Sequence, residues 1–230
     1  LGSPVLDLQI GDVARRAMRQ DRPTYATLSA DPEREGAGSC DVFVEVFVPA
    51  PELLIVGAGH IAVPLAKIAK INEFEVIVLD DRPSYANVAR FPDADRVLAA
   101  DIQETVASYR VTSRTHVVLV TRGHQHDVQA LRTLLSSKAR YIGMIGSRRR
   151  VWTVLKLMHD EGASADDLLR IHAPIGLEIE AITPAEIATA IMGEIINVRR
   201  GGKAQSMSEP VRDMFRHRLE RESLAEASPF

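Results

Sequence analysis

The chain has 230 residues, of which 46% are hydrophobic, and a single cysteine. That length allows one large hydrophobic core with a small appendage. The net charge of -3 and the sequence pI of about 6.2 argue against general binding to nucleic acid. A lone cysteine, Cys40, excludes an internal disulfide framework and favours a reducing compartment, so we expect a cytoplasmic location.

No apolar run is long enough to span a membrane, because glycine and proline residues such as Gly57 and Pro64 interrupt the best candidate. The sequence shows no signal peptide. The start at Leu1 instead of methionine indicates a processed or truncated product.

Residues 1–50 carry short elements, and we interpret them as an N-terminal extension or the remnant of a larger N-terminal domain. Helical spacing runs over residues 11–19, and residues 24–29 have strand character. Residues 41–47 alternate with the two-residue period of a strand. Cys40 directly precedes this strand, and we interpret it as structural.

A buried strand and a glycine-rich turn open the main domain, which we predict over residues 51–202. The apolar residues 53–56 are typical of a strand buried on both faces of a parallel sheet. A helical pattern follows the turn at once, and the turn residues are Gly57, Ala58, Gly59 and His60. The free N–H groups of such a turn and the positive end of the helix dipole form a site for a phosphate.

An acidic residue ends the next strand. The apolar run over residues 75–79 leads to Asp80, whose carboxylate can accept hydrogen bonds from both ribose hydroxyls of a dinucleotide. In the alternative interpretation, Asp80 caps the turn that follows. Asp81 and Arg82 come next, and Arg82 could receive a 2′-phosphate. The order of strand, turn, helix, strand and acid predicts a Rossmann-type unit.

Strands and helices continue to alternate along the chain. Further strands are predicted at residues 96–100, 115–121 and 141–146. Right-handed crossovers between parallel strands then predict an α/β fold, a doubly wound and mainly parallel Rossmann-like sheet of order 3-2-1-4-5. Later helices are predicted at residues 148–159, 164–169 and 184–198. Residues 203–230 form a polar tail with an amphipathic helix.

Polar residues follow the fourth strand at the point where this sheet binds ligands. They are Arg122, Gly123, His124 and Asp127. Because the strand order reverses between strands one and four, their two turns should face each other across one pocket for an anionic ligand. Alternatively, Asp127 caps the next helix, and His60 bonds to a nearby carbonyl. The histidine spacing is not a diagnostic zinc pattern, so we predict neither a metal site nor a catalytic residue.

The fifth strand is also followed by a turn with anion-binding character. Gly146 and Ser147 come first, and Ser147 is the predicted N-cap of the next helix. Three arginines beginning with Arg148 then oppose the helix dipole. This placement indicates either a bound anion or carboxylates elsewhere in the fold, against the alternative of a solvated face. The glutamates at 178, 180, 186 and 194 are expected to be solvated or to cap helices.

Several motifs in one order resemble the XdhC/CoxI family. They are Pro49-x-Pro51, Leu-Leu-Ile-Val-Gly-Ala-Gly-His-Ile-Ala at 53–62, Asp-Arg-Pro at 81–83, Arg-Phe-Pro-Asp-Ala-Asp at 90–95, Thr-Arg-Gly-His-x-x-Asp at 121–127, Tyr-Ile-Gly-Met-Ile-Gly-Ser-Arg-Arg at 141–149, Pro-Ile-Gly-Leu at 174–177 and Thr-Pro-Ala-Glu-Ile-Ala at 183–188. The resemblance covers residues 40–202 and implies a Rossmann-like C-terminal domain of a maturation factor for xanthine dehydrogenase or carbon monoxide dehydrogenase.

The resemblance also implies a function. Such a factor binds molybdenum cofactor, shields it during sulfuration and passes it to the apo-molybdoenzyme, with a cysteine desulfurase as a second partner. Two features depart from the family: a Ser-Gly-Gly-Cys-type motif does not occur in residues 1–230, and residues 178–181 read Glu-Ile-Glu-Ala where Asp-x-Gly-Ala is expected.

We therefore interpret the chain as a cofactor-insertion accessory protein and not as an enzyme. One alternative is an NAD(P)-dependent oxidoreductase with His124 as general acid. Another is a non-catalytic scaffold with a vestigial nucleotide site. The apolar last helix of the main domain and the polar tail permit a homodimer.

Overall fold

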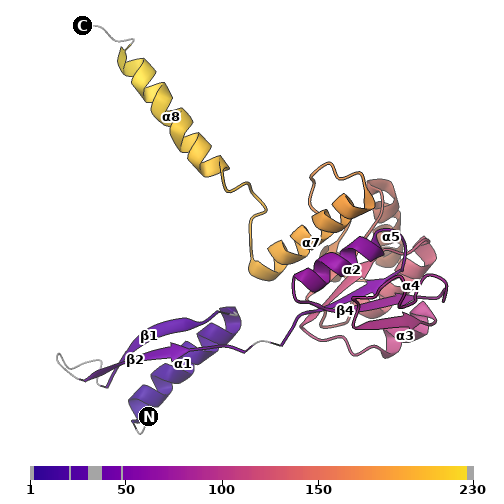
Figure 1. Ribbon diagram of the computed structural model, residues 1–230, viewed down its shortest axis with the longest axis horizontal. Coiled ribbons are helices and arrows are strands. Elements are labelled where there is room, and N and C mark those ends of the chain that lie inside the picture. Colours follow the sequence, from indigo (N-terminus) through magenta and orange to yellow (C-terminus); the bar gives the residue numbers. More distant parts are fainter. Residues whose placement is uncertain (1–2, 21, 31–37, 48, 227–230) are drawn as a thin grey trace. The chain divides into compact units, whose positions relative to one another are not determined.

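The computed structural model describes residues 3–20, 22–30, 38–47 and 49–226. The chain forms two compact units, Leu1–Pro49 and Ala50–Phe230. In the first unit, helix α1 (Pro4–Gln20) packs against the antiparallel strands β1 (Thr24–Ser29) and β2 (Ser39–Val44), as Figure 1 shows. The helix is longer than the expected span of 11–19, because proline suits its first turn.

A six-stranded parallel sheet forms the centre of the second unit. Its strands are β3 (Glu52–Val56), β4 (Glu75–Asp80), β5 (Arg96–Ala99), β6 (Thr115–Leu119), β7 (Tyr141–Met144) and β8 (Ile171–His172). The order β5-β4-β3-β6-β7-β8 confirms the predicted 3-2-1-4-5 arrangement and adds β8, which the sequence analysis missed. Only two residues of β8 pair with β7, which is too short a run to show a strand pattern.

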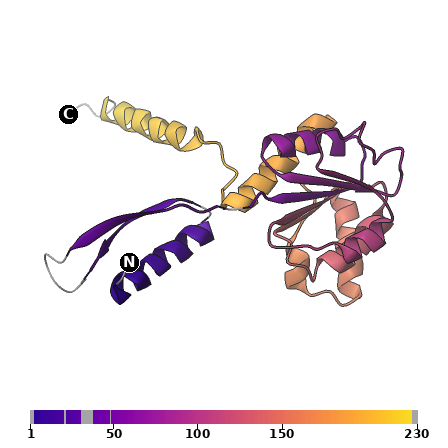
Figure 2. The same ribbon diagram turned by 60° about the horizontal axis from the view of Figure 1, so that its bottom comes forward.

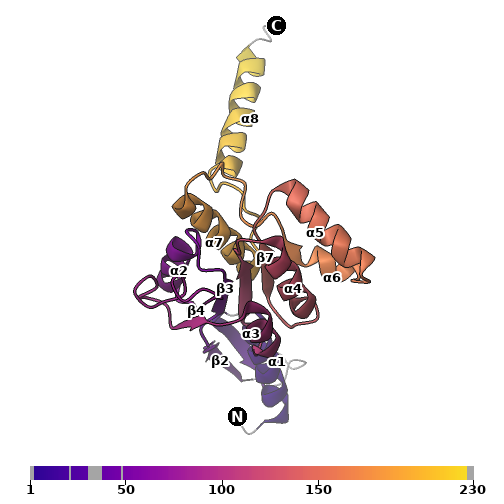
Figure 3. The same cartoon turned by 90° about the vertical axis from the view of Figure 1, so that its right-hand side faces the viewer.

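Helices cover both faces of this sheet, giving three layers (Figures 2 and 3). Leu53 and Ile55 of β3 pack with α2 (Ala62–Ile71) and α7 (Pro184–Arg200). Leu54 and Val56 face the other way, into the core shared by α3 (Ile102–Ser108), α4 (His124–Leu134) and α5 (Arg148–Asp160). Burial on both faces explains why the strand is an unbroken apolar run.

Side-chain caps fix where the later helices begin. The Ser147 hydroxyl accepts the Arg150 N–H at 3.3 Å, as predicted for α5. At α7, Thr183 and Glu186 form a reciprocal capping box: Thr183 Oγ1 accepts the Glu186 N–H at 3.3 Å, and Glu186 Oε2 accepts the Thr183 N–H at 2.8 Å.

Two further helices complete the second unit. They are α6 (Ala165–Leu169), capped by Ser164, and α8 (Glu209–Glu226), which lies in the predicted polar tail. None of the helices in the described part of the chain is long and apolar enough to cross a membrane.

Candidate functional site

The turn after β3 lies directly against the turn after β6. Gly57 adopts a φ of 105°, and a Cβ atom there would lie 2.5 Å from the carbonyl oxygen of Val120. Only glycine tolerates both conditions. By contrast, a Cβ at Gly59 would meet nothing within 4 Å, and His60 is exposed. The crest of this turn is therefore open to a ligand, while its base is packed.

The carboxylate of Asp80 is fully occupied by the protein itself. Its Oδ2 accepts the Ala58 N–H at 2.7 Å and Arg82 Nη2 at 2.9 Å, and its Oδ1 accepts the Arg82 N–H and Nε. Burial opposes ionisation, yet these bonds from Arg82 and Ala58 lower the pKa of Asp80 to about 2. Four bonds fill its acceptor positions, so ribose hydroxyls would have to displace Arg82. The alternative interpretation, in which Asp80 closes the following turn, matches the bond to the Arg82 N–H.

An ion pair joins the turns on either side of β3. Arg122 Nη2 lies 3.0 Å from Asp81 Oδ2, and Arg82 Nε lies 3.8 Å from Asp81 Oδ1. Because Asp81 follows β4 and Arg122 follows β6, this pair crosses the carboxyl end of β3. The Arg82 guanidinium also lies 3.7 Å from the centre of the Tyr85 ring, which holds it in place.

Asp127 is a buried anchor of the turn after β6. Its carboxylate is fully buried, accepts a hydrogen bond from Thr121 Oγ1 at 2.5 Å and pairs with Arg150 of α5. Burial raises the pKa of Asp127, and the bonds from Thr121 and Arg150 oppose that rise. Asp127 therefore binds Thr121 and Arg150 and does not cap the helix, and its carboxylate is unavailable to a ligand.

A cavity of about 400 Å³ opens beside this anchor, between the turns after β6 and β7 and the first turns of α5. Its lining residues are Arg122, Gly123, Ser147, Arg149, Arg150, Thr153 and Val154. The side chain of Arg149 forms no hydrogen bond or ion pair with any described residue, whereas Arg150 is fixed by Asp127. A positively charged cavity at a helix N-terminus can hold an anionic oxygen group.

The predicted site residues divide between this cavity and its surroundings. Arg122, Gly123 and Ser147 line it. Arg148 instead points to the surface, where its guanidinium is 90% exposed and lies 3.9 Å from Glu178. Gly146 directly precedes the Ser147 cap. His124 begins α4, but its side chain lies outside the described part of the structure.

The roles of three residues were missed from the sequence: Arg149 and Arg150 at the cavity, and Glu194 elsewhere in the fold. Arg149 and Arg150 were not singled out from the arginine run, although helical spacing places successive residues on different sides. Glu194 is not solvated as expected: its carboxylate accepts hydrogen bonds from Tyr141 Oη at 2.5 Å and the Gly176 N–H at 3.0 Å. These bonds and the nearby His172 outweigh burial and lower the pKa of Glu194. This contact joins α7 to the start of β7, and periodicity alone does not reveal it.

A parallel sheet with helices on both faces and a glycine turn after its central strand define a Rossmann-type domain, and a basic cavity lies at the carboxyl edge of its sheet. The XdhC Rossmann domain family matches residues 53–195. The chain belongs to this family.

Similar proteins support the assignment. A probable xanthine dehydrogenase subunit of Bacillus subtilis (strain 168) is 33% identical over 160 residues, which is 70% of this chain and 46% of the relative. The molybdenum cofactor insertion chaperone PaoD of Escherichia coli (strain K12) is 26% identical over 110 residues, 48% of this chain and 35% of the relative. A crystal structure of a xanthine dehydrogenase from Bacillus halodurans superposes with a TM-score of 0.61 at 29% identity, covering 74% of this chain and 50% of that one. The chain thus spans half or less of the length of these relatives.

Proposed function

We propose that this domain binds molybdenum cofactor at the carboxyl edge of its sheet and delivers it to an apo-molybdoenzyme. The observation that carries the proposal is the basic cavity beside α5, with the Arg149 side chain free of any partner in the described chain. The name of PaoD as a molybdenum cofactor insertion chaperone supports it.

The donor set fits the phosphate end of such a cofactor. Ser147 and Arg149 line the cavity and would bind phosphate oxygens, together with the free N–H groups of the first turn of α5. Arg150, held by Asp127, keeps positive charge at the cavity wall. When bound, the molybdenum centre supplies the redox chemistry of the recipient enzyme, whereas this chain binds, orients and shields it.

Arg122 connects the cavity to the turn that follows β4. Its guanidinium is 54% exposed and pairs with Asp81 across the end of β3, yet it also lines the cavity. An incoming phosphate competes with Asp81 for this arginine, because phosphate binds guanidinium bidentately. Binding would thereby be coupled to the turn that follows β4.

The partners form part of the same proposal. An apo-molybdoenzyme receives the cofactor, and a cysteine desulfurase acts during its sulfuration. The chain works in the cytoplasm, and a homodimer is the assembly we propose for it. Co-purification of tagged chain with each partner, compared with untagged extract, measures these contacts directly. If neither partner is recovered, the proposal that the chain delivers the cofactor is refuted.

Cofactor retention tests the binding step. The purified full chain is incubated with molybdenum cofactor released from a molybdoenzyme, and co-elution is measured by gel filtration. Arg149→Gln should lower retention about 10-fold or more, since a bond between two charged groups is lost. Lys156→Gln is the matched control, because Lys156 lies on the same helix, lies outside the cavity lining and pairs with Asp160 at the surface. Tight binding of NAD with no retention of molybdenum cofactor would refute the proposal.

A further inference from the structure

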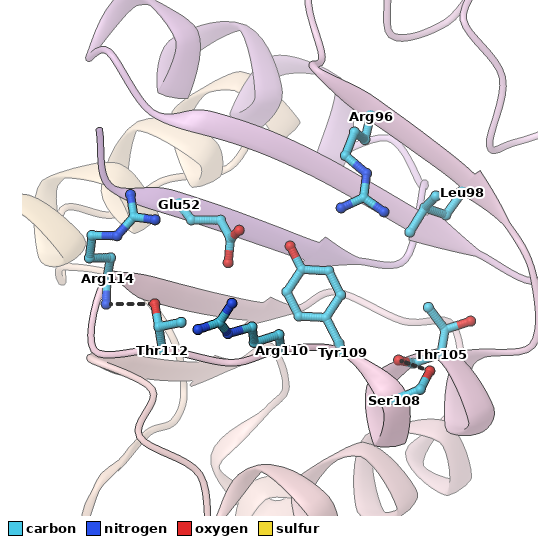
Figure 4. Close-up of a pocket in the computed structure, with 9 residues that line it drawn as sticks. All are labelled: Glu52, Arg96, Leu98, Thr105, Ser108, Tyr109, Arg110, Thr112 and Arg114. Carbon is cyan, nitrogen blue, oxygen red and sulfur yellow. Dashed lines mark hydrogen bonds between the residues drawn. The ribbon is translucent and has the colours of Figure 1, made fainter. Parts of the chain in front are cut away.

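A second and larger cavity lies at the opposite edge of the same sheet, where the strands begin. It encloses about 600 Å³, and its lining residues are Glu52, Arg96, Leu98, Thr105, Ser108, Tyr109, Arg110, Thr112 and Arg114 (Figure 4). Glu52 opens β3, Arg96 opens β5, and Arg114 directly precedes β6. The sheet therefore separates this cavity from the carboxyl-edge site.

Positive charge dominates the lining. Three arginines line the space against the single carboxylate of Glu52, and Figure 4 shows Arg96 and Arg110 on either side of Tyr109. Arg114 is partly engaged, since its Nη1 donates to the carbonyl oxygen of Ala50 at 2.6 Å. The side chains of Arg96 and Arg110 form no hydrogen bond or ion pair with any described residue. Two cationic side chains on different elements are therefore available to one ligand.

The one carboxylate of the lining, that of Glu52, forms no ion pair with these arginines. Glu52 Oε1 accepts the Thr115 hydroxyl at 2.8 Å, and Glu52 also holds the Tyr109 hydroxyl. Burial and then the neighbouring Glu52 raise the pKa of Tyr109, so the phenol stays protonated at neutral pH. The Glu52–Tyr109 pair thus forms a fixed polar wall, and Glu75 is a further acid within electrostatic range of that phenol.

We propose that this cavity binds a small phosphomonoester, with its phosphate between Arg96 and Arg110 and its polar body against the Glu52–Tyr109 wall. Guanidinium groups match phosphate oxygens bidentately. The cavity volume is in the range typical of small-molecule sites. Inorganic phosphate has the phosphate group but lacks the organic part that would contact Glu52 and Tyr109.

Calorimetric titration of the full chain tests the proposal. The probes are adenosine 5′-monophosphate, ribose 5-phosphate, inorganic phosphate and succinate, the last as a dianion without phosphorus. At least one ester should bind more tightly than inorganic phosphate, and inorganic phosphate more tightly than succinate. Arg96→Gln and Arg110→Gln should each weaken ester binding about 10-fold or more, because each removes a charged hydrogen bond.

Lys156→Gln is the matched control, since it removes a positive charge that lines neither cavity and pairs with Asp160 at the surface. It should leave ester binding unchanged, and an unchanged melting temperature should show that all three variants fold. Four results would each overturn the proposal: no binding of either ester, succinate binding as tight as phosphate binding, no gain of either ester over inorganic phosphate, or a loss from Lys156→Gln as large as that from Arg96→Gln or Arg110→Gln. Because the two cavities use different arginines, a negative result in this titration does not affect the outcome of the cofactor-retention test.

Discussion

Replacement of Gly57 by alanine probes the contact that positions the central turn. A residue with a side chain at a φ of 105° is strained by about 1–3 kcal/mol. The new Cβ would also lie 2.5 Å from the oxygen and 2.7 Å from the carbon of the Val120 carbonyl. These are backbone atoms next to the 2.9 Å bond from the Val120 N–H to the Val56 oxygen, so they cannot move without loosening the pairing of β3 with β6. Such overpacking adds about 1–3 kcal/mol.

The two contributions together predict a loss of about 2–6 kcal/mol from Gly57→Ala. For a chain of this length, the melting temperature should fall by roughly 5–20 °C. Thermal unfolding followed by far-UV circular dichroism measures the change. Trp152, the only tryptophan, lies on α5, so its fluorescence reports on the second unit.

Gly59→Ala is the matched control two residues away. A Cβ there meets nothing within 4 Å, and Gly59 has no positive φ, so stability should change by no more than about 0.5 kcal/mol. The reasoning would be refuted if the two variants melted together, or if Gly57→Ala melted within about 2 °C of the unmodified chain.

Three further predictions concern contacts around the sheet. Thr183→Ala removes the capping box of α7 and should destabilise the fold by about 1 kcal/mol in urea unfolding; no measurable change would contradict that role. Asp127→Asn leaves Arg150 without its buried partner and should cost about 3 kcal/mol in the same assay, whereas a stabilised variant would contradict the ion pair. Glu194→Gln tests a lowered pKa. A lowered pKa in the folded state stabilises the fold above the unfolded pKa, and that contribution is lost as the pH falls. The loss of unfolding free energy caused by Glu194→Gln should therefore become smaller as the pH falls from about 6 to about 3. A loss that stays constant with pH would show that the charge on Glu194, next to Tyr141, does not contribute to stability.

Local patterns predicted most of the sheet because each pattern has a direct physical cause. Residues 53–56 and 75–80 are apolar throughout their central positions, since both of their faces are covered by helices. Helix starts at Ser147 and Thr183 were predicted because a cap depends only on residues within three positions. The short helix α3 and the two-residue strand β8 were missed, because neither is long enough to display a period.

Site chemistry was harder to predict, because it depends on partners far apart in the chain. The predicted strand order indicated that the turns after β3 and β6 lie together. It did not show that Arg82 and Ala58 fill the acceptor positions of Asp80, or that Arg150 pairs with Asp127. It named Arg148 as a candidate anion contact, which stays a prediction, and it did not show that Arg149 lines the cavity.

The sequence alone determined the Rossmann-type sheet, its family and the edge at which an anionic ligand is expected, because burial, turn geometry and capping act over short distances. Tertiary structure alone decided which charges remain free to bind a ligand. Whether an arginine or a carboxylate is available depends on what lies within about 3 Å of it, and those neighbours come from other strands and helices.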